Sequence, residues 1–216
     1  MIPNLQRLVE DYVRHQGGGP LLGVTLGIVT NNSDPDRLGR VKVKFPLLNG
    51  SDESFWARVA APMAGNGRGI CFLPDIDDEV LVMTDRSDLR FAYVIGALWN
   101  GKERPPVDNA DGKNNLRVIK SRSGHEIRFN DEAGKEKFEI IDAGGHNRVV
   151  IDTTHKTITV TSGQDIVLSA PEGAIKLAAR KVEIDASASV GIKAGTGMNV
   201  SASGTLNVSG STVNIN

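Results

Sequence analysis

The last sixty residues decide the fold, and residues 157–216 read TITVTSGQDIVLSAPEGAIKLAARKVEIDASASVGIKAGTGMNVSASGTLNVSGSTVNIN. Apolar residues occur here in pairs separated by one residue, and successive pairs begin 7 to 9 residues apart. The eight pairs are Ile158/Val160, Ile166/Leu168, Ile175/Leu177, Val182/Ile184, Val190/Ile192, Met198/Val200, Leu206/Val208 and Val213/Ile215. Residues at i and i+2 lie on one face of an extended strand. The stretch therefore predicts short β-strands that repeat about every eight residues along an axis.

The residues between the apolar pairs support this interpretation. The residue inside each pair points to the other face, and seven of the eight are polar or glycine, with Val167 as the exception. Glycines and small polar residues fill the gaps, as tight corners require. A disordered Ser/Gly/Ala tail is the alternative, because no charged residue follows Lys193. Such a tail would not keep its apolar pairs in register.

One chain cannot easily close such a structure. Eight strands wound alone into a three-sided prism would give fewer than three full coils, with little core and open ends. Three chains wound together pair every strand edge except those at the two ends. We therefore predict that residues 157–216 are one third of an intertwined trimeric β-prism. The first seven pairs, from Ile158/Val160 to Leu206/Val208, form its expected trimer core.

Residues 21–101 alternate like an all-β domain with turn signals between the strands. The candidate strands are Leu22–Asn31, Arg40–Phe45, Phe55–Pro62, Gly69–Leu73, Glu79–Thr84 and Phe91–Leu98. Five or six short strands in about eighty residues suit a small closed barrel such as an OB-fold. The single cysteine, Cys71, lies in the apolar run 70–73, so we expect a buried structural thiol rather than a nucleophile.

Residues 1–20 are expected to hold a short amphipathic helix and a linker. Helical spacing over residues 4–15 places five apolar side chains on one face: Leu5, Leu8, Val9, Tyr12 and Val13. Asn4 can cap the start, and the run Gly17–Pro20 ends the helix. A helix this short needs packing for its apolar face, either on its own domain or on a partner.

Residues 102–115 are interpreted as a linker, rich in Gly, Pro, Asn and Asp and too short for a further domain. Apolar pairs then resume at wider spacing: Leu116/Val118, Ile127/Phe129, Phe138/Ile140 and Val149/Ile151. The turns between them are longer and charged. We interpret this stretch as the wide upper part of the same prism, so that the spike-like domain spans residues 116–216.

Composition excludes several classes of function. The formal net charge is −1 and aromatic residues are 5%, so no broad electrostatic surface for nucleic acid or anionic membrane is visible. The chain has no signal peptide and no apolar run near the length of a membrane span, so we expect synthesis in the cytoplasm.

No motif typical of catalysis or metal binding appears in the sequence. His125, His146 and His155 lie 21 and 9 residues apart, which does not match metal spacing, although a threefold axis could gather three copies of one of them. The spacing of Asn32, Asp34 and Asp36 is better explained by a turn than by a calcium loop. We expect no catalytic site, no cofactor and no metal.

Two clusters of carboxylates lie in turns and are interpreted as solvated loop charges, with a glycosidase pair as the alternative. The clusters are Asp131/Glu132 and Asp75/Asp77/Asp78/Glu79.

Several short segments resemble a known family when they are taken in order. They are Trp56–Ala60, Gly65, Gly69, Leu73–Pro74, Asp78–Val82, Val94–Gly96, Asn100–Gly101 and Pro105–Pro106, followed by Ser123–Ile127 and Asp131. This combination resembles the OB-fold domain and early β-helix of contractile-injection spikes, a family that includes phage baseplate assembly protein V and the VgrG proteins of type VI secretion. The resemblance covers about residues 21–216. Asp77 departs from it, because the family usually has glycine there.

The resemblance implies a homotrimeric needle that caps the tube at the baseplate and pierces the target envelope, crossing the target membrane only transiently. It implies a hub on a separate protein, with the inner tube reached through that hub, and assembly into a phage tail-like particle. We expect the hub to contact the apolar face of residues 5–13. We expect a small PAAR-type protein to bind the tip at Thr212, Val213, Asn214, Ile215 and Asn216. A polysaccharide-degrading β-helix enzyme and an OB-fold nucleic-acid binder are the alternatives.

Overall fold

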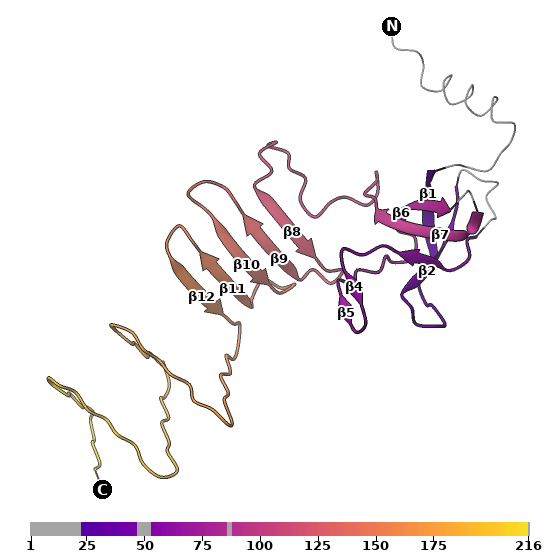
Figure 1. Cartoon of the computed structure of the whole chain (residues 1–216). Helices are drawn as coiled ribbons and strands as arrows, with labels where there is room; N and C mark the ends of the chain where they lie inside the picture. The colour runs from indigo at the N-terminus through magenta and orange to yellow at the C-terminus, as the bar shows by residue number, and fades with distance from the viewer. Residues whose placement is uncertain (1–22, 47–52, 86–87, 216) are drawn as a thin grey trace, which may run out of the picture. The chain divides into compact units, whose positions relative to one another are not determined.

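The structure is a computed structural model that describes residues 23–46, 53–85 and 88–215. The chain divides into two units after Gln164. Every regular element within the described ranges is a β-strand, which confirms the all-β prediction (Figure 1). The helix predicted at residues 4–15 lies outside the described residues. In the part of the chain that the structure describes, no helix has the length and apolar character needed to cross a membrane.

Five strands of the first unit close into a barrel, which confirms the predicted OB-fold. Its strands, in spatial order, are β1 (Val24–Asn31), β2 (Arg40–Lys44), β3 (Ala57–Val59), β7 (Asp88–Ala97) and β6 (Glu79–Asp85). The pairing of β3 with β7 is parallel, and the other pairings in the barrel are antiparallel.

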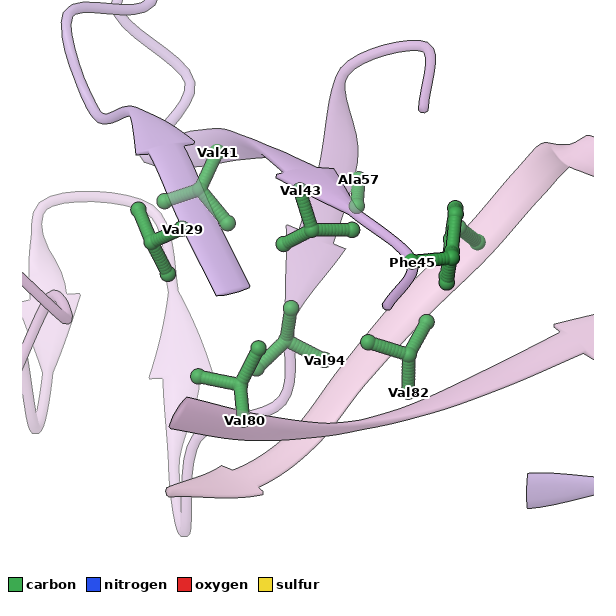
Figure 2. Close-up of a cluster of buried hydrophobic side chains, with 9 residues drawn as sticks. Val29, Val41, Val43, Phe45, Ala57, Val80, Val82 and Val94 are labelled. Carbon is green, nitrogen blue, oxygen red and sulfur yellow. The ribbon is translucent and has the colours of Figure 1, made fainter. Parts of the chain in front are cut away.

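The barrel core is made by alternate residues of these strands, as a closed sheet with one dry face requires. The side chains labelled in Figure 2 converge on this interior: Val29, Val41, Val43, Phe45, Ala57, Val80, Val82 and Val94. Gly27 faces the same interior. A Cβ atom at Gly27 would lie 2.9 Å from Cγ2 of Val82 and 3.3 Å from Cβ of Val43. Glycine at this position therefore leaves room for the inward-pointing side chains of the two neighbouring strands, β2 and β6.

The predicted fourth strand, Gly69–Leu73, is wrong. Two short strands, β4 (Ala64–Gly65) and β5 (Arg68–Gly69), form a separate hairpin, and residues 70–73 follow it without strand pairing. Cys71 is exposed in the protomer, so the prediction of a buried thiol is also wrong for the single chain. The run is apolar at consecutive rather than alternate positions, and the parallel pairing of β3 with β7 closes the barrel without it.

A five-stranded antiparallel sheet follows the barrel. Its strands lie in chain order: β8 (Leu116–Lys120), β9 (Glu126–Asn130), β10 (Lys137–Ile141), β11 (Arg148–Asp152) and β12 (Thr157–Thr161). Side chains in the turns tie neighbouring hairpins together. The Asn147 Oδ1 atom accepts hydrogen bonds from the Ser162 hydroxyl at 2.9 Å and from the Gly163 amide at 3.1 Å. At the other end of strands β10 and β11, the amide and hydroxyl of Thr153 donate to the Glu136 carbonyl.

The second unit, residues 165–215, runs back and forth as an extended trace (Figure 1). None of its described residues pairs into a strand within the chain, and each described side chain is exposed. This is the geometry expected for one chain of an intertwined structure, whose hydrogen-bond partners belong to other chains. The trimer itself remains a prediction.

Candidate assembly interface

One face of the five-stranded sheet is apolar and uncovered. The strand register places the apolar residues of β9 to β12 directly opposite one another: Phe129, Phe138, Ile151 and Ile158 in one row, and Ile127, Ile140, Val149 and Val160 in the next. The Phe129 and Phe138 rings pack with centroids 5.0 Å apart. Most of these side chains are nevertheless exposed in the protomer. A contiguous apolar face of this kind marks an interaction surface.

Strand β8 contributes to this apolar face the residues that the sequence pattern had placed on the other face. Ile119 lies opposite Ile127, and Arg117 lies opposite Phe129. The predicted pair Leu116/Val118 therefore points to the other side of the sheet, and this part of the prediction is wrong. The turn sets the register: the Ser121 amide donates to the His125 carbonyl at 2.9 Å, and a shift of one residue reverses every side chain.

The other face of the sheet is largely polar. Glu126 lies between two cations, with Lys120 Nζ at 2.8 Å and Arg128 forming a second ion pair. Lys120, and then Arg128, hold the pKa of the Glu126 carboxyl below its usual range. In an antiparallel sheet with one apolar and one charged face, the apolar face typically packs against other residues and the charged face remains in water.

The expected trimer-core residues are exposed in the single chain. The first members of the six pairs in the second unit are 50–56% exposed: Ile166, Ile175, Val182, Val190, Met198 and Leu206. The second members are 68–72% exposed: Leu168, Leu177, Ile184, Ile192, Val200 and Val208. The physical reason is that an isolated extended trace has no second layer to cover its apolar face, so burial needs other chains.

The exposure of these pairs nevertheless follows a constant pattern. Within each of these six pairs, the first side chain is less exposed than the second. Ile158 and Val160, which lie in β12, show the reverse order, 72% and 55%. The expected trimer-core residues thus fall into one pair on the sheet and six pairs in the repeats, and their burial in a trimer stays a prediction.

The last apolar pair departs from this pattern. Val213 is 47% exposed and Ile215 is 89% exposed, so Ile215 protrudes furthest of the paired residues. The remaining tip candidates, Thr212 and Asn214, are exposed as well, whereas Asn216 lies outside the described residues.

The carboxylate clusters that suggested a glycosidase are engaged in local contacts. Asp131 pairs with Arg117, and Glu132 accepts from Lys135 Nζ at 2.9 Å. Asp75 pairs with Arg122 at 3.2 Å, while one oxygen of Asp78 accepts from the Asp75 amide at 2.8 Å. Glu79 accepts from the Asn100 amide group at 3.3 Å. These contacts are those of turns and strand ends.

Asp34 organises the turn between β1 and β2. A turn, rather than a calcium loop, is what the sequence predicts at this position. Its carboxylate accepts from the backbone amides of Asp36, Leu38 and Arg40 and from the Arg40 guanidinium at 2.7 and 2.9 Å. The guanidinium above all, assisted by these amides, holds the pKa of Asp34 far below its usual range despite the opposing effect of burial. The oxygens that a cation would need are thus engaged by the chain itself.

The histidines lie in separate turns. The His125 Nδ1 atom accepts from the Ala143 amide at 3.2 Å, and His155 Nδ1 lies 3.0 Å from an oxygen of Asp152. The Cβ and Cγ atoms of His146 pack against Gly163. No group of three or more His, Cys, Asp or Glu side chains within the described ranges could hold a metal ion.

Cations and aromatic rings alternate on the outer surface of β2, β3 and β7, a pattern that sequence reasoning missed. Arg40 and Lys42 lie 6.0 and 5.6 Å from the centre of the Trp56 ring, and Arg58 lies 4.8 Å from that of Tyr93. Nucleic-acid-binding OB-folds use such surfaces. However, Arg40 pairs with Asp34 and Asp36, and Lys42 pairs with Glu53, so the charge on this surface is largely neutralised.

Comparisons with known proteins identify the barrel. Residues 25–99 match the type VI secretion system/phage-baseplate injector OB domain. The chain is 29% identical over 147 residues to the actin cross-linking toxin VgrG1 of Vibrio cholerae, covering 63% of this chain and 13% of that protein. It is 26% identical over 160 residues to the V. cholerae type VI secretion system spike protein VgrG3, covering 66% and 16%. It is 33% identical over 122 residues to the spike protein VgrG2a of Pseudomonas aeruginosa, covering 52% and 14%.

Proposed function

Since the chain belongs to the VgrG-like baseplate and spike family through its type VI secretion system/phage-baseplate injector OB domain, we propose that it is a structural spike of a contractile injection apparatus. Three copies form a needle that caps the tube at the baseplate and pierces the target envelope. The spike carries no enzymatic activity and works within an assembled phage tail-like particle. The matched stretch spans less than a fifth of the relatives' length, so the activities named for those proteins are not transferred.

The regular, uncovered apolar pairs of residues 166–208 carry this proposal. Burying one aliphatic side chain of this size stabilises a structure by about 1.5–3 kcal/mol, and a single chain buries none of these pairs. In the proposed trimer, each pair faces the same axis as its equivalents from two other chains. The apolar face of the β8–β12 sheet is likewise covered by other chains, and its charged face remains in water.

This arrangement suits a protein that acts by stiffness. Each strand proposed for residues 165–216 pairs with strands from other chains, so a force along the axis loads many hydrogen bonds together. Local opening of one strand would break its hydrogen bonds on both edges and would expose apolar side chains in the same step. The needle therefore resists bending without any disulfide or metal in its proposed shaft.

The solution mass tests the trimer. Light scattering is expected to give three times the 23.1 kDa of one chain, and the assembly is expected to survive mild detergent. A stable, folded monomer at micromolar concentration would overturn the proposal. Electron microscopy of an assembled particle with this chain labelled then tests its place at the baseplate.

Two partners complete the proposal, a separate hub protein and a PAAR-type tip protein. Residues 212–215 present a protruding apolar pair and unpaired backbone, which another chain can extend by strand addition. Removing residues 207–216 is expected to abolish tip binding and to leave the trimer intact. Removing residues 1–16 is expected to weaken hub binding only. Unchanged affinity in either truncated protein would remove that partner from the proposal.

A further inference from the structure

A cavity of about 740 Å³ lies beside the β4–β5 hairpin, and we call it the hairpin pocket. Four of its apolar side chains are well exposed in the protomer: Leu38, Met63, Ile70 and Phe72. Arg37 and Arg68 also line it and are exposed, which makes the pocket cationic as well as apolar. Neighbouring exposed apolar side chains of this size are normally covered by a partner.

The turn before β6 has the opposite character. Ile76 is 55% exposed and is flanked by Asp75 and Asp77. Three hydrogen bonds fix the turn: the Asp77 amide donates to the Val29 carbonyl, and Asp75 and Asp78 each donate an amide to the other. Asp77 adopts a left-handed backbone with φ of 75°, which the family's usual glycine would adopt more readily. The turn thus presents an apolar knob between two carboxylates on a fixed support.

A ring of three identical subunits needs two different, complementary patches on each subunit, because its contacts run head to tail. The hairpin pocket and the Ile76 knob are both apolar, and they are complementary in charge through Asp77. The pocket carries two arginines, whereas Asp75 on the other side of the knob is already paired with Arg122 at 3.2 Å. We propose that the Ile76 knob of one protomer docks into the hairpin pocket of the next, so that the barrels form a closed ring. This inference rests on the trimer proposed above and identifies a contact within it.

Cys71 provides a native probe of this contact. It is the single cysteine of the chain, it lines the hairpin pocket, and it is exposed in the protomer. Docking of the neighbour's knob covers it. In the assembled protein, a maleimide is expected to modify Cys71 at least about tenfold more slowly than in the urea-unfolded chain, since labelling then needs an opening of the ring.

Charge reversal tests which residues make the contact. Arg68→Glu and Asp77→Arg each place like charges together and are expected to raise the labelling rate of the intact trimer about threefold or more. The double variant restores the opposite charges and is expected to return the rate toward that of the unmodified protein. Lys113→Glu, in the linker, is the matched control and is expected to leave the rate unchanged.

The outcomes separate this contact from the trimer itself. A monomer by light scattering would overturn both proposals. An intact trimer in which Cys71 reacts as fast as in the unfolded chain would overturn only the knob-in-pocket contact. A double variant that labels as fast as the two single variants would show that Arg68 and Asp77 do not face each other, and would overturn the assignment.

Discussion

The Asp34 carboxylate shows how one residue can hold a turn. Its pKa is lowered in the folded chain, chiefly by Arg40, so the folded state favours the ionised form more strongly than the unfolded chain does. The resulting stability is fully present above the unfolded-state pKa of about 4 and declines as the pH falls below it. Asp34→Asn is therefore expected to lower the melting temperature at pH 7 and to differ less from the unmodified protein at pH 3.

Thermal unfolding of both proteins at the two pH values measures this effect. Asp36→Asn is the comparison, because Asp36 is exposed and makes a single ion pair with Arg40. A melting-temperature difference that stays constant from pH 7 to pH 3 would contradict the role assigned to the Asp34 charge.

Asp77 illustrates strain at a single residue. Its φ of 75° is disfavoured for residues with a Cβ atom and is natural for glycine. We expect Asp77→Gly to raise the free energy of unfolding by up to about 1 kcal/mol and Asp77→Val to lower it by about 1–2 kcal/mol. Chemical denaturation with urea measures both. Equal stability of the two variants would mean that the turn relaxes to another conformation.

Gly27 and Gly96 both lie in strands of the barrel, and comparing them tests how tightly these strands are packed. A Cβ atom at Gly27 would press on Val43 and Val82, whereas one at Gly96 would meet no atom within 4 Å. Gly27→Ala is expected to destabilise the barrel by about 1–3 kcal/mol through overpacking. Gly96→Ala is expected to be neutral or stabilising by up to about 1 kcal/mol. Urea denaturation measures the stability of both variants. If Gly27→Ala leaves the stability unchanged, β1 can move outward.

Assembly of the whole molecule depends on the repeated pairs. Ile192→Asp would place three carboxylates at one level of the proposed axis, each buried without a partner. The yield of soluble trimer is expected to collapse. Asn199→Asp is the control, because Asn199 lies inside a pair and faces outward, and its trimer yield should be normal. A normal yield for Ile192→Asp, measured by light scattering after purification, would mean that the pairs face solvent.

Local pattern determined much of this protein before any fold was known. Alternating β-branched residues and turn signals predicted the barrel, because side chains two residues apart in a strand point to the same face, whatever surrounds the strand. The spacing of the apolar pairs in residues 157–216 likewise predicted extended repeats, and the structure gives six of these pairs one common exposure pattern.

Only the tertiary structure shows how a residue lies relative to residues far away in the sequence. The face occupied by Leu116 and Val118 depends on the register fixed by the turn after β8, and a single-residue shift leaves the local pattern intact. Cys71 lies in an apolar run that reads as buried, yet the barrel closes through β3 and β7 and leaves that run outside. The knob at Ile76 and the hairpin pocket became visible only once the chain was folded, because complementarity between surfaces arises from side chains that folding brings together.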